Sequence, residues 1–168
     1  FEQIDDAARN WEIALNIDGV VNCCQAVAED MLGRSSGSIV NVSSNCALVG
    51  ETAENLVHYG SVKGFVNAFS RSLAWEWAKK GVRVNTIAPA WIVPPSEHNI
   101  SQNSFWKKMG FALMGRPEVA QQAFDDGTLE HRDRLPMTRL GRAEDIASMA
   151  LFLSSDKASF VTGQMISV

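Results

Sequence analysis

The stretch HYGSVKG, residues 58 to 64, places a phenol and an ammonium group four residues apart. Tyr59 is the only tyrosine of the chain, and Lys63 follows it at a spacing that puts both side chains on one face of a helix. A free phenol, with a pKa near about 10, is a weak acid–base catalyst at neutral pH, and a nearby ammonium lowers that pKa. The pair therefore indicates proton transfer by Tyr59. A surface tyrosine and lysine at this spacing by chance is the open alternative.

Two serines could bring hydroxyl groups to the same place. Ser43 and Ser44 end the stretch SIVNVSS, a β-branched run typical of a short buried strand. In open parallel α/β sheets, ligands bind beyond the carboxyl ends of the strands. Residues 89 to 92 follow the next predicted strand and should reach the same edge. The sequence thus predicts a crevice in which serine, phenol and ammonium meet, with Ser43 or Ser44 as the serine that faces it.

Helices and strands that alternate along the chain must position these residues. The predicted helices cover residues 5–33, 57–80 and 142–155. The predicted strands cover residues 38–43, 82–89 and 161–168. Strands separated by helices of this length indicate parallel pairing through right-handed crossovers.

His58 precedes Tyr59, and its side chain should point about 100° away around the helix, which predicts a surface or interface role.

Residues 90 to 135 are predicted to form an irregular insert with helical stretches near 101–114 and 117–126. Its large apolar side chains could form a lid over a substrate or pack subunits together, and both interpretations stay open. The side chains concerned are Trp91, Phe105, Trp106, Phe111 and Met114.

Composition excludes several classes of function. Hydrophobic residues make up 46% and charged residues 20%, as in ordinary globular proteins. The net charge of −4 comes without a basic block, which disfavours a nucleic-acid or membrane-surface partner. No apolar run reaches the roughly 18 residues of a membrane span. The 3 cysteines lack metal-ligand spacing, so we expect reduced thiols, no metal site and, by default, a cytoplasmic protein.

Five motifs resemble, in order and spacing, those of the short-chain dehydrogenase/reductase family. They are WEIALNIDG, GSIVNVSS, YGSVKG, GVRVNTIAP and RLGRAEDIASMALFLSSDKASFVTGQMISV. The resemblance runs along nearly the whole chain. It implies an α/β fold, the C-terminal part of a doubly wound parallel-sheet domain of Rossmann type. Residues 1–168 would be a single partial domain with a substrate-loop insert at about 90–135.

The resemblance also implies a role for each residue that matches a motif. Tyr59 would be the general acid–base, and Lys63 would lower its pKa and bind the nicotinamide ribose. Ser44 would polarise the substrate carbonyl, and Asn16 would hold a water that links Lys63 to solvent.

Further contacts with cofactor and substrate are implied by the same resemblance. Pro89, Ala90 and Ile92 would face the nicotinamide, together with Tyr59 and Lys63. Ser44 and Tyr59 would contact the substrate. By position alone, Cys46, two residues past Ser44, could line the substrate pocket or be a small buried thiol, and Trp91 in the apolar insert could contact the substrate.

The function implied is the NAD(P)-dependent interconversion of a secondary alcohol and a ketone, with a small-molecule substrate and a homodimer or homotetramer. The chain lacks the Gly-rich turn that binds the pyrophosphate. We therefore expect the C-terminal portion of a longer enzyme, inactive as the 168-residue piece alone, with NAD or NADP as cofactor.

Two alternative functions remain open. One is a catalytically silent relative that serves as a binding or scaffold subunit. It is suggested by Pro94, which stands where the family often has a threonine, and by the segment from Ser44 to Tyr59, which is about two residues longer than the family usually has. The other is an epimerase or dehydratase with a tightly held nicotinamide.

Overall fold

The computed structural model describes residues 2, 4–50, 56–102, 104, 107, 116–129 and 136–168. Contacts divide the chain into two compact units. The first comprises Phe1–Ala90 and Ala147–Val168, and the second is Trp91–Ile146. The second unit contains the predicted insert at about 90–135. A single domain over 1–168 stays a prediction.

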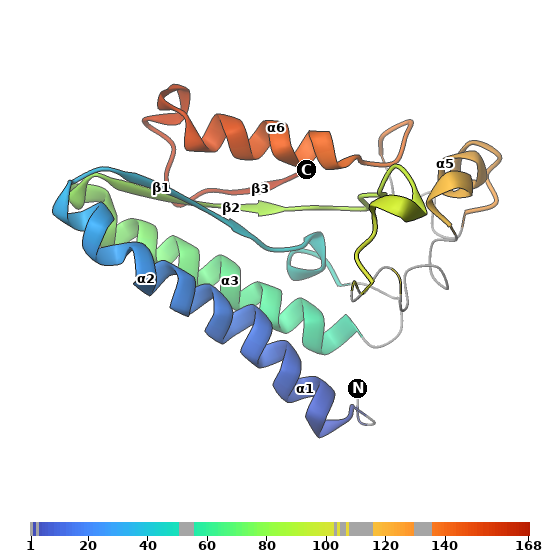
Figure 1. The fold of residues 1–168 in the computed structure, drawn as a ribbon, viewed down its shortest axis with the longest axis horizontal. Coiled ribbons are helices and arrows are strands. Elements are labelled where there is room, and N and C mark those ends of the chain that lie inside the picture. Colours follow the sequence, from blue (N-terminus) through green and yellow to red (C-terminus); the bar gives the residue numbers. More distant parts are fainter. Residues whose placement is uncertain are drawn as a thin grey trace. The chain divides into compact units, whose positions relative to one another are not determined.

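A three-stranded parallel sheet with the order β1-β2-β3 forms the centre of the first unit (Figure 1). β1 spans Gly37–Val42, β2 spans Val82–Ala88 and β3 spans Met165–Ser167. Gly37 lies opposite Val82, and Thr86 lies opposite Met165. The predicted parallel pairing is confirmed.

The last strand is shorter than the predicted range 161–168. The hydroxyl of Thr162 accepts the backbone N–H of Val84 at 3.1 Å. Gly163 follows with a φ of 70°, in the left-handed region that glycine adopts without strain. The chain therefore turns at these residues, and regular strand pairing begins only at Met165.

The first predicted helix is confirmed, but it is not continuous. α1 spans Asp6–Ile13, a π-helical turn spans Ala14–Asp18, and α2 spans Gly19–Gly33. The Asn16 side-chain amide donates to the carbonyl of Glu12 at 3.1 Å, so it competes with the backbone for that acceptor. A π turn accommodates one extra residue and frequently occurs at functional sites.

α3 spans Leu56–Trp77 and packs with α2 on one side of the sheet, opposite α6 (Figure 1). A 3₁₀ turn, Ala78–Lys80, follows α3 and ends at Gly81, which has a φ of 79°. A Cβ on Gly81 would overlap the backbone carbonyl of Ser35, so only glycine fits this turn into β2. Buried side chains between α3 and β2 form the core of this unit: Ala74, Trp77, Val82 and Val84. Burial of each large side chain contributes roughly 1.5–3 kcal/mol.

α6 spans Ala143–Ser154, and its residues from Ala147 onward belong to the first unit. The carbonyl of Leu153 accepts the Ser38 hydroxyl at 3.0 Å and the Arg83 guanidinium at 2.7 Å. These bonds anchor the carboxyl end of α6 to β1 and β2.

The second unit contains α5, Pro117–Asp125, which confirms the helix predicted near 117–126. Gly141 pairs with Ile92 in an isolated parallel bridge. A small core joins this bridge region to α5, and its buried residues are Val93, Ala120, Phe124, Leu129 and Leu140. Most of the helical stretch predicted at 101–114, with Phe105, Trp106, Phe111 and Met114, lies outside the described residues.

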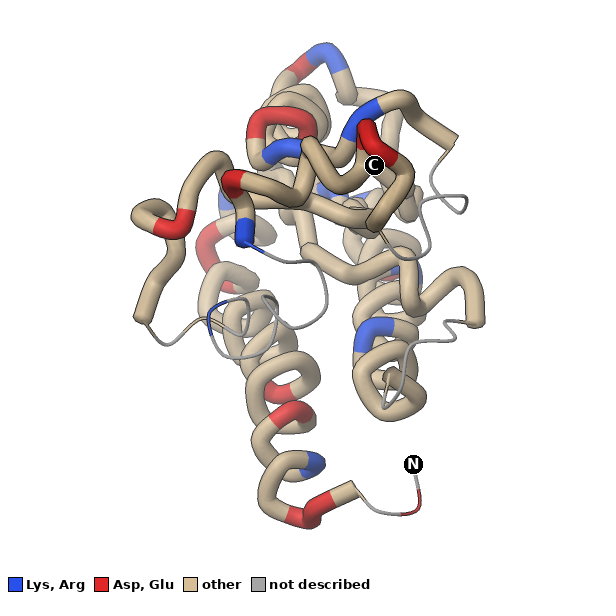
Figure 2. Tube along the Cα trace, turned by 90° about the vertical axis from the view of Figure 1, so that its right-hand side faces the viewer, with Lys and Arg blue, Asp and Glu red and all other residues tan. Residues whose placement is uncertain are grey.

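Charged residues of both signs are interspersed along the described chain (Figure 2). Where the structure is described, no helix combines the length and the apolar character needed to cross a bilayer.

Candidate active site

The carboxyl ends of β1 and β2 lie side by side. The backbone N–H of Ser43 donates to the carbonyl of Ile87 at 2.7 Å. The N–H of Asn45 donates to the carbonyl of Pro89 at 3.0 Å, and Pro89 and Ala90 are half-buried at this edge. These bonds continue the β1–β2 ladder past Val42, so the segments after both strands are held at one place.

The two serines after β1 point to different partners. The hydroxyl of Ser43 donates to the backbone carbonyl of Lys63 at 3.0 Å and so ties β1 to α3. The hydroxyl of Ser44 accepts the N–H of Cys46 at 3.3 Å and lies near the Tyr59 phenol, whose pKa it acts to lower. Both serines are buried. Ser44 is therefore the serine that meets the phenol.

Tyr59 and Lys63 lie on the first turns of α3, and both are half-buried. The Lys63 Nζ is 5.8 Å from the centroid of the Tyr59 ring. It donates a hydrogen bond to the carbonyl of Val42, the last residue of β1, at 3.1 Å. The structure thus brings together the phenol, the ammonium and the Ser44 hydroxyl, as the spacing predicted.

The lowering of the Tyr59 pKa by Lys63 stays a prediction, and burial sets the direction of the shift in this structure. Burial raises the pKa of Tyr59 above its usual value of 10.0, and the nearby Cys46 and Glu12 raise it further. The nearby Ser44 hydroxyl acts in the opposite direction but does not outweigh burial. Burial also lowers the pKa of Lys63. The phenol is therefore held in its protonated form at neutral pH.

Asn16 lies in the π turn between α1 and α2, which packs against α3. Its side chain is buried, with 9% exposed, and its amide donates to the carbonyl of Glu12. The predicted water link between Asn16 and Lys63 stays a prediction.

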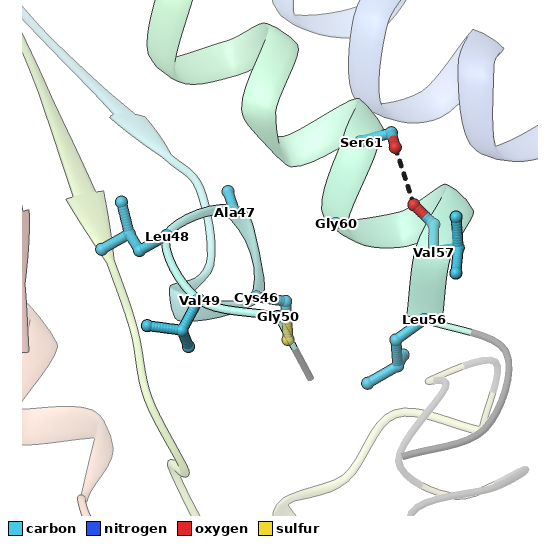
Figure 3. A pocket seen from close by; sticks show the side chains of 9 residues that line it. All are labelled: Cys46, Ala47, Leu48, Val49, Gly50, Leu56, Val57, Gly60 and Ser61. Atoms are coloured by element: carbon cyan, nitrogen blue, oxygen red, sulfur yellow. Dashed lines mark hydrogen bonds between the residues drawn. The ribbon is translucent and has the colours of Figure 1, made fainter. Parts of the chain in front are cut away.

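A pocket of about 360 Å³ opens between the loop after β1 and the first turns of α3 (Figure 3). Its described lining residues are uncharged: Cys46, Ala47, Leu48, Val49, Gly50, Leu56, Val57, Gly60 and Ser61. Sequence reasoning had identified only Cys46 among them. Gly60 allows the loop to approach the helix, because a Cβ there would lie 2.8 Å from the carbonyl oxygen of Cys46. A glycine inside a strong helical pattern was the signal that could have found this contact.

Trp91 and Ile92 belong to the second unit. The half-buried Trp91 packs against the core cluster of that unit, which contains Val93 and Phe124. The backbone carbonyl of Trp91 accepts the N–H of Gly141 at 2.9 Å. The contacts predicted for Trp91 with substrate and for Ile92 with cofactor stay predictions.

The donors at the carboxyl end of β1 fit one end of a nicotinamide dinucleotide. An ammonium group has three donors, and the bond to Val42 uses one of them at Lys63. Together with a phenol and a serine hydroxyl, such an ammonium can bind ribose hydroxyls and a carbonyl oxygen. The 168 residues contain no Gly-rich turn of the kind that binds a pyrophosphate. The fit therefore concerns the nicotinamide–ribose end.

Comparison with known proteins gives matches along the whole chain. Residues 1–104 match the family model described as short chain dehydrogenase, and residues 111–168 match the model described as Enoyl-(Acyl carrier protein) reductase. Galactitol 2-dehydrogenase (L-tagatose-forming) of Cereibacter sphaeroides is 32% identical over 99% of this chain and 57% of its own length.

Solved structures of similar proteins carry nicotinamide cofactors. A 3-oxoacyl-[acyl-carrier protein] reductase from Brucella melitensis with bound NAD is 26% identical, with a TM-score of 0.75 over 99% of this chain and 52% of that one. ElxO with NADP bound is 27% identical, with a TM-score of 0.74 over 100% of this chain and 59% of that one.

The chain spans about half the length of the curated relatives it matches. The predicted Rossmann-type α/β fold with a parallel sheet is confirmed by these structural neighbours. The family model that covers residues 1–104, the ordered motifs and the shared fold lead to one conclusion: the chain belongs to the short chain dehydrogenase family.

Proposed function

We propose that this chain is the catalytic part of an NAD(P)-dependent oxidoreductase that interconverts a secondary alcohol and a ketone. The observation that carries the proposal is that the Ser44 hydroxyl, the Tyr59 phenol and the Lys63 ammonium gather at the carboxyl end of β1. Two hydroxyl groups that meet in this way can both donate to one substrate oxygen. The dehydrogenases and reductases among the relatives support the same reaction class.

In the reduction, the ketone oxygen accepts hydrogen bonds from Ser44 and Tyr59. Both donors are fixed before the reaction, so they stabilise the negative charge that develops on the oxygen without reorganising. Tyr59 then gives its proton to that oxygen. The pKa of Tyr59 is not lowered in this structure, so the phenol carries this proton at neutral pH. In the oxidation, Tyr59 accepts the proton of the alcohol.

The cofactor, when bound, supplies or accepts the hydride. Lys63 binds the ribose hydroxyls with the donors that the Val42 carbonyl does not use. Pro89, Ala90 and Ile92 would hold the nicotinamide ring through their backbone. Asn16 holds a water that links Lys63 to solvent. Neighbours with bound NAD and with bound NADP support either cofactor.

The substrate would place an uncharged part in the pocket beside Cys46, because none of the described lining residues carries a charge. Trp91 would contact another part of the substrate. Polyols and 3-oxoacyl thioesters are the first compounds to test, because relatives are named for them.

A cytoplasmic homodimer or homotetramer completes the proposal. Trp75 on α3 is 89% exposed and Trp11 on α1 is 62% exposed, which supports burial against a second copy. Light scattering on the full protein tests this assembly, and a monomer at micromolar concentration would contradict it.

The substitution Ser44→Ala tests the proposed function. It removes one of the two hydroxyls that would bind the substrate oxygen. We expect kcat for ketone reduction to fall about 10²–10³-fold, as when one oxyanion donor is lost, with cofactor binding nearly unchanged. Consumption of NADH and NADPH is measured in the full protein over a panel of ketones.

Ser72→Ala is the matched control, because Ser72 is an exposed serine on α3. Equal activity in Ser44→Ala and the wild type would contradict the proposed roles. A wild type that binds cofactor but turns over no ketone would favour a scaffold subunit, and turnover without net consumption of NAD(P)H would favour an epimerase or dehydratase.

A further inference from the structure

His58 lies on the first turn of α3, immediately before Tyr59, and its imidazole ring contacts α1. The sequence predicted a surface or an interface role for His58. Its side chain is only 14% exposed, which argues against the surface role. The imidazole Nε2 lies 3.3 Å from the backbone carbonyl of Arg9 and 3.7 Å from the carboxylate Oε2 of Glu12. The ring therefore connects the first turn of α3 to α1.

The Glu12 carboxylate faces the same place and is incompletely satisfied. Its Oε2 atom is buried and has no hydrogen-bond partner among the described residues. A distance of 3.7 Å is too long for a hydrogen bond, so the His58 ring and the Glu12 carboxylate face each other without one. A buried carboxylate oxygen is costly unless a charge or donor compensates it. The guanidinium of Arg9 pairs instead with Asp6, at 3.0 Å.

Glu12 also contacts Asn16, a residue of the candidate site. Its backbone carbonyl accepts the side-chain amide of Asn16 at 3.1 Å. One residue thus contacts Asn16 through its main chain and His58 through its side chain. Tyr59 follows His58 directly, so Glu12 links the π turn to the turn of α3 that carries the phenol.

We propose that Glu12 and His58 form a positioning pair that locks α1 onto the first turn of α3 and so fixes Asn16 and Tyr59 relative to each other. The pair touches neither substrate nor cofactor and acts through these two residues. The inference deepens the proposed function and rests on it. The negative charge of Glu12 is felt at the phenol, because Glu12 is one of the groups that raise the pKa of Tyr59.

The first test measures the ionisation of Tyr59 in the full protein by phenolate absorbance. Tyr59 is the only tyrosine of these 168 residues, and subtraction of the spectrum of Tyr59→Phe isolates its signal. Glu12→Gln keeps the size of the side chain but removes its charge, so we expect the pKa of Tyr59 to fall. Asp6→Asn is the matched control, because it removes an exposed acid from the same helix. We expect it to leave the Tyr59 pKa unchanged.

The second test separates positioning from general stability. His58→Leu removes both ring nitrogens, and we expect kcat to fall by up to about 10²-fold, the effect of a small misplacement of a catalytic group, while KM for the cofactor changes little. His58→Gln keeps a donor that can reach the Arg9 carbonyl, and we expect it to restore part of kcat. The double variant Glu12→Gln/His58→Leu should lose no more than the worse single variant, because the two residues act as a unit.

Three outcomes would overturn the inference. The first is a Tyr59 pKa that Glu12→Gln leaves unchanged. The second is an equal shift in Asp6→Asn, which would indicate a general charge effect. The third is additive losses in the double variant. Full activity in Tyr59→Phe would overturn the proposed function instead, and the pKa of Tyr59 in Glu12→Gln would then still decide whether the pair acts on the phenol.

Discussion

At the scale of single residues, the proposed reaction depends on the protonation of one phenol. Tyr59 is half-buried beside Ser44, and burial dominates the shift of its pKa. The spacing to Lys63 correctly predicted that both side chains share a face. Four residues on a helix specify a face, whereas the desolvation of a phenol depends on what covers it. The groups that act on the phenol include Ser44, Cys46 and Glu12, and the spacing of Tyr59 and Lys63 says nothing about them.

The raised pKa of Tyr59 predicts opposite pH dependences for the two directions of the reaction. Reduction needs the protonated phenol, so its rate should be constant at neutral pH and fall as the pH rises through the raised pKa, above about 10. Oxidation needs the phenolate or a partly deprotonated phenol, so its rate should rise over the same range.

We measure kcat in both directions between about pH 6 and about pH 11. The apparent pKa is compared with that of an unperturbed tyrosine, about 10. Enzyme stability is checked at each pH. A folded-state pKa above the unfolded value means that the phenol stabilises the fold below about pH 10 and that this contribution is lost as the pH rises through the raised pKa. A reduction rate that falls already between pH 6 and pH 8 would contradict the assignment of Tyr59 as the proton donor.

At the scale of elements, the helices and strands were predictable because their patterns are local. The apolar periodicity of residues 57–80 and the β-branched run before Ser43 matched α3 and β1 closely. The π turn at Asn16 was not predictable, because its cause is a side chain that takes the carbonyl of Glu12 from the helix ladder. The strand predicted at 161–168 begins only at Met165 for a similar reason. The side-chain hydroxyl of Thr162 accepts the backbone N–H of Val84 in β2.

The approach of α3 to the loop after β1 predicts different effects for two glycines of one helix. Gly60→Ala places a Cβ 2.8 Å from the carbonyl of Cys46, so the loop that lines the pocket must move. We expect kcat/KM for the ketone to fall about 10-fold or more, because a small displacement of a positioned group is costly. Gly64→Ala meets no atom within 4 Å. It should stabilise the protein by roughly 0.5–1 kcal/mol and keep its activity.

Steady-state kinetics and urea unfolding of both variants in the full protein check this pair. Equal kinetics in Gly60→Ala and the wild type would contradict the close packing of the loop on α3. A loss of activity in Gly64→Ala equal to that in Gly60→Ala would show that helix glycines matter here for a reason other than this contact.

At the scale of the whole molecule, the family and the parallel α/β fold followed from the order of five motifs. The pocket beside Cys46 did not, because its walls come from a loop and a helix turn whose distance no spacing rule gives. The same holds for the pair Glu12 and His58, which are 46 residues apart in sequence and meet only after α1 packs on α3. Local patterns thus identify the elements and the residues that carry chemistry, while the groups that tune those residues depend on packing.

The substitution Tyr59→Phe tests the central claim most directly, because it removes one oxygen atom and keeps the ring. In the full protein with cofactor and an accepted ketone, we expect kcat to fall about 10²–10⁴-fold, the usual contribution of a general acid. Cofactor affinity should stay within a few-fold of the wild type, since Lys63 keeps its bond to Val42. Turnover that survives at the wild-type rate would contradict the role of Tyr59 as the proton donor and, with it, the reaction mechanism proposed for this chain.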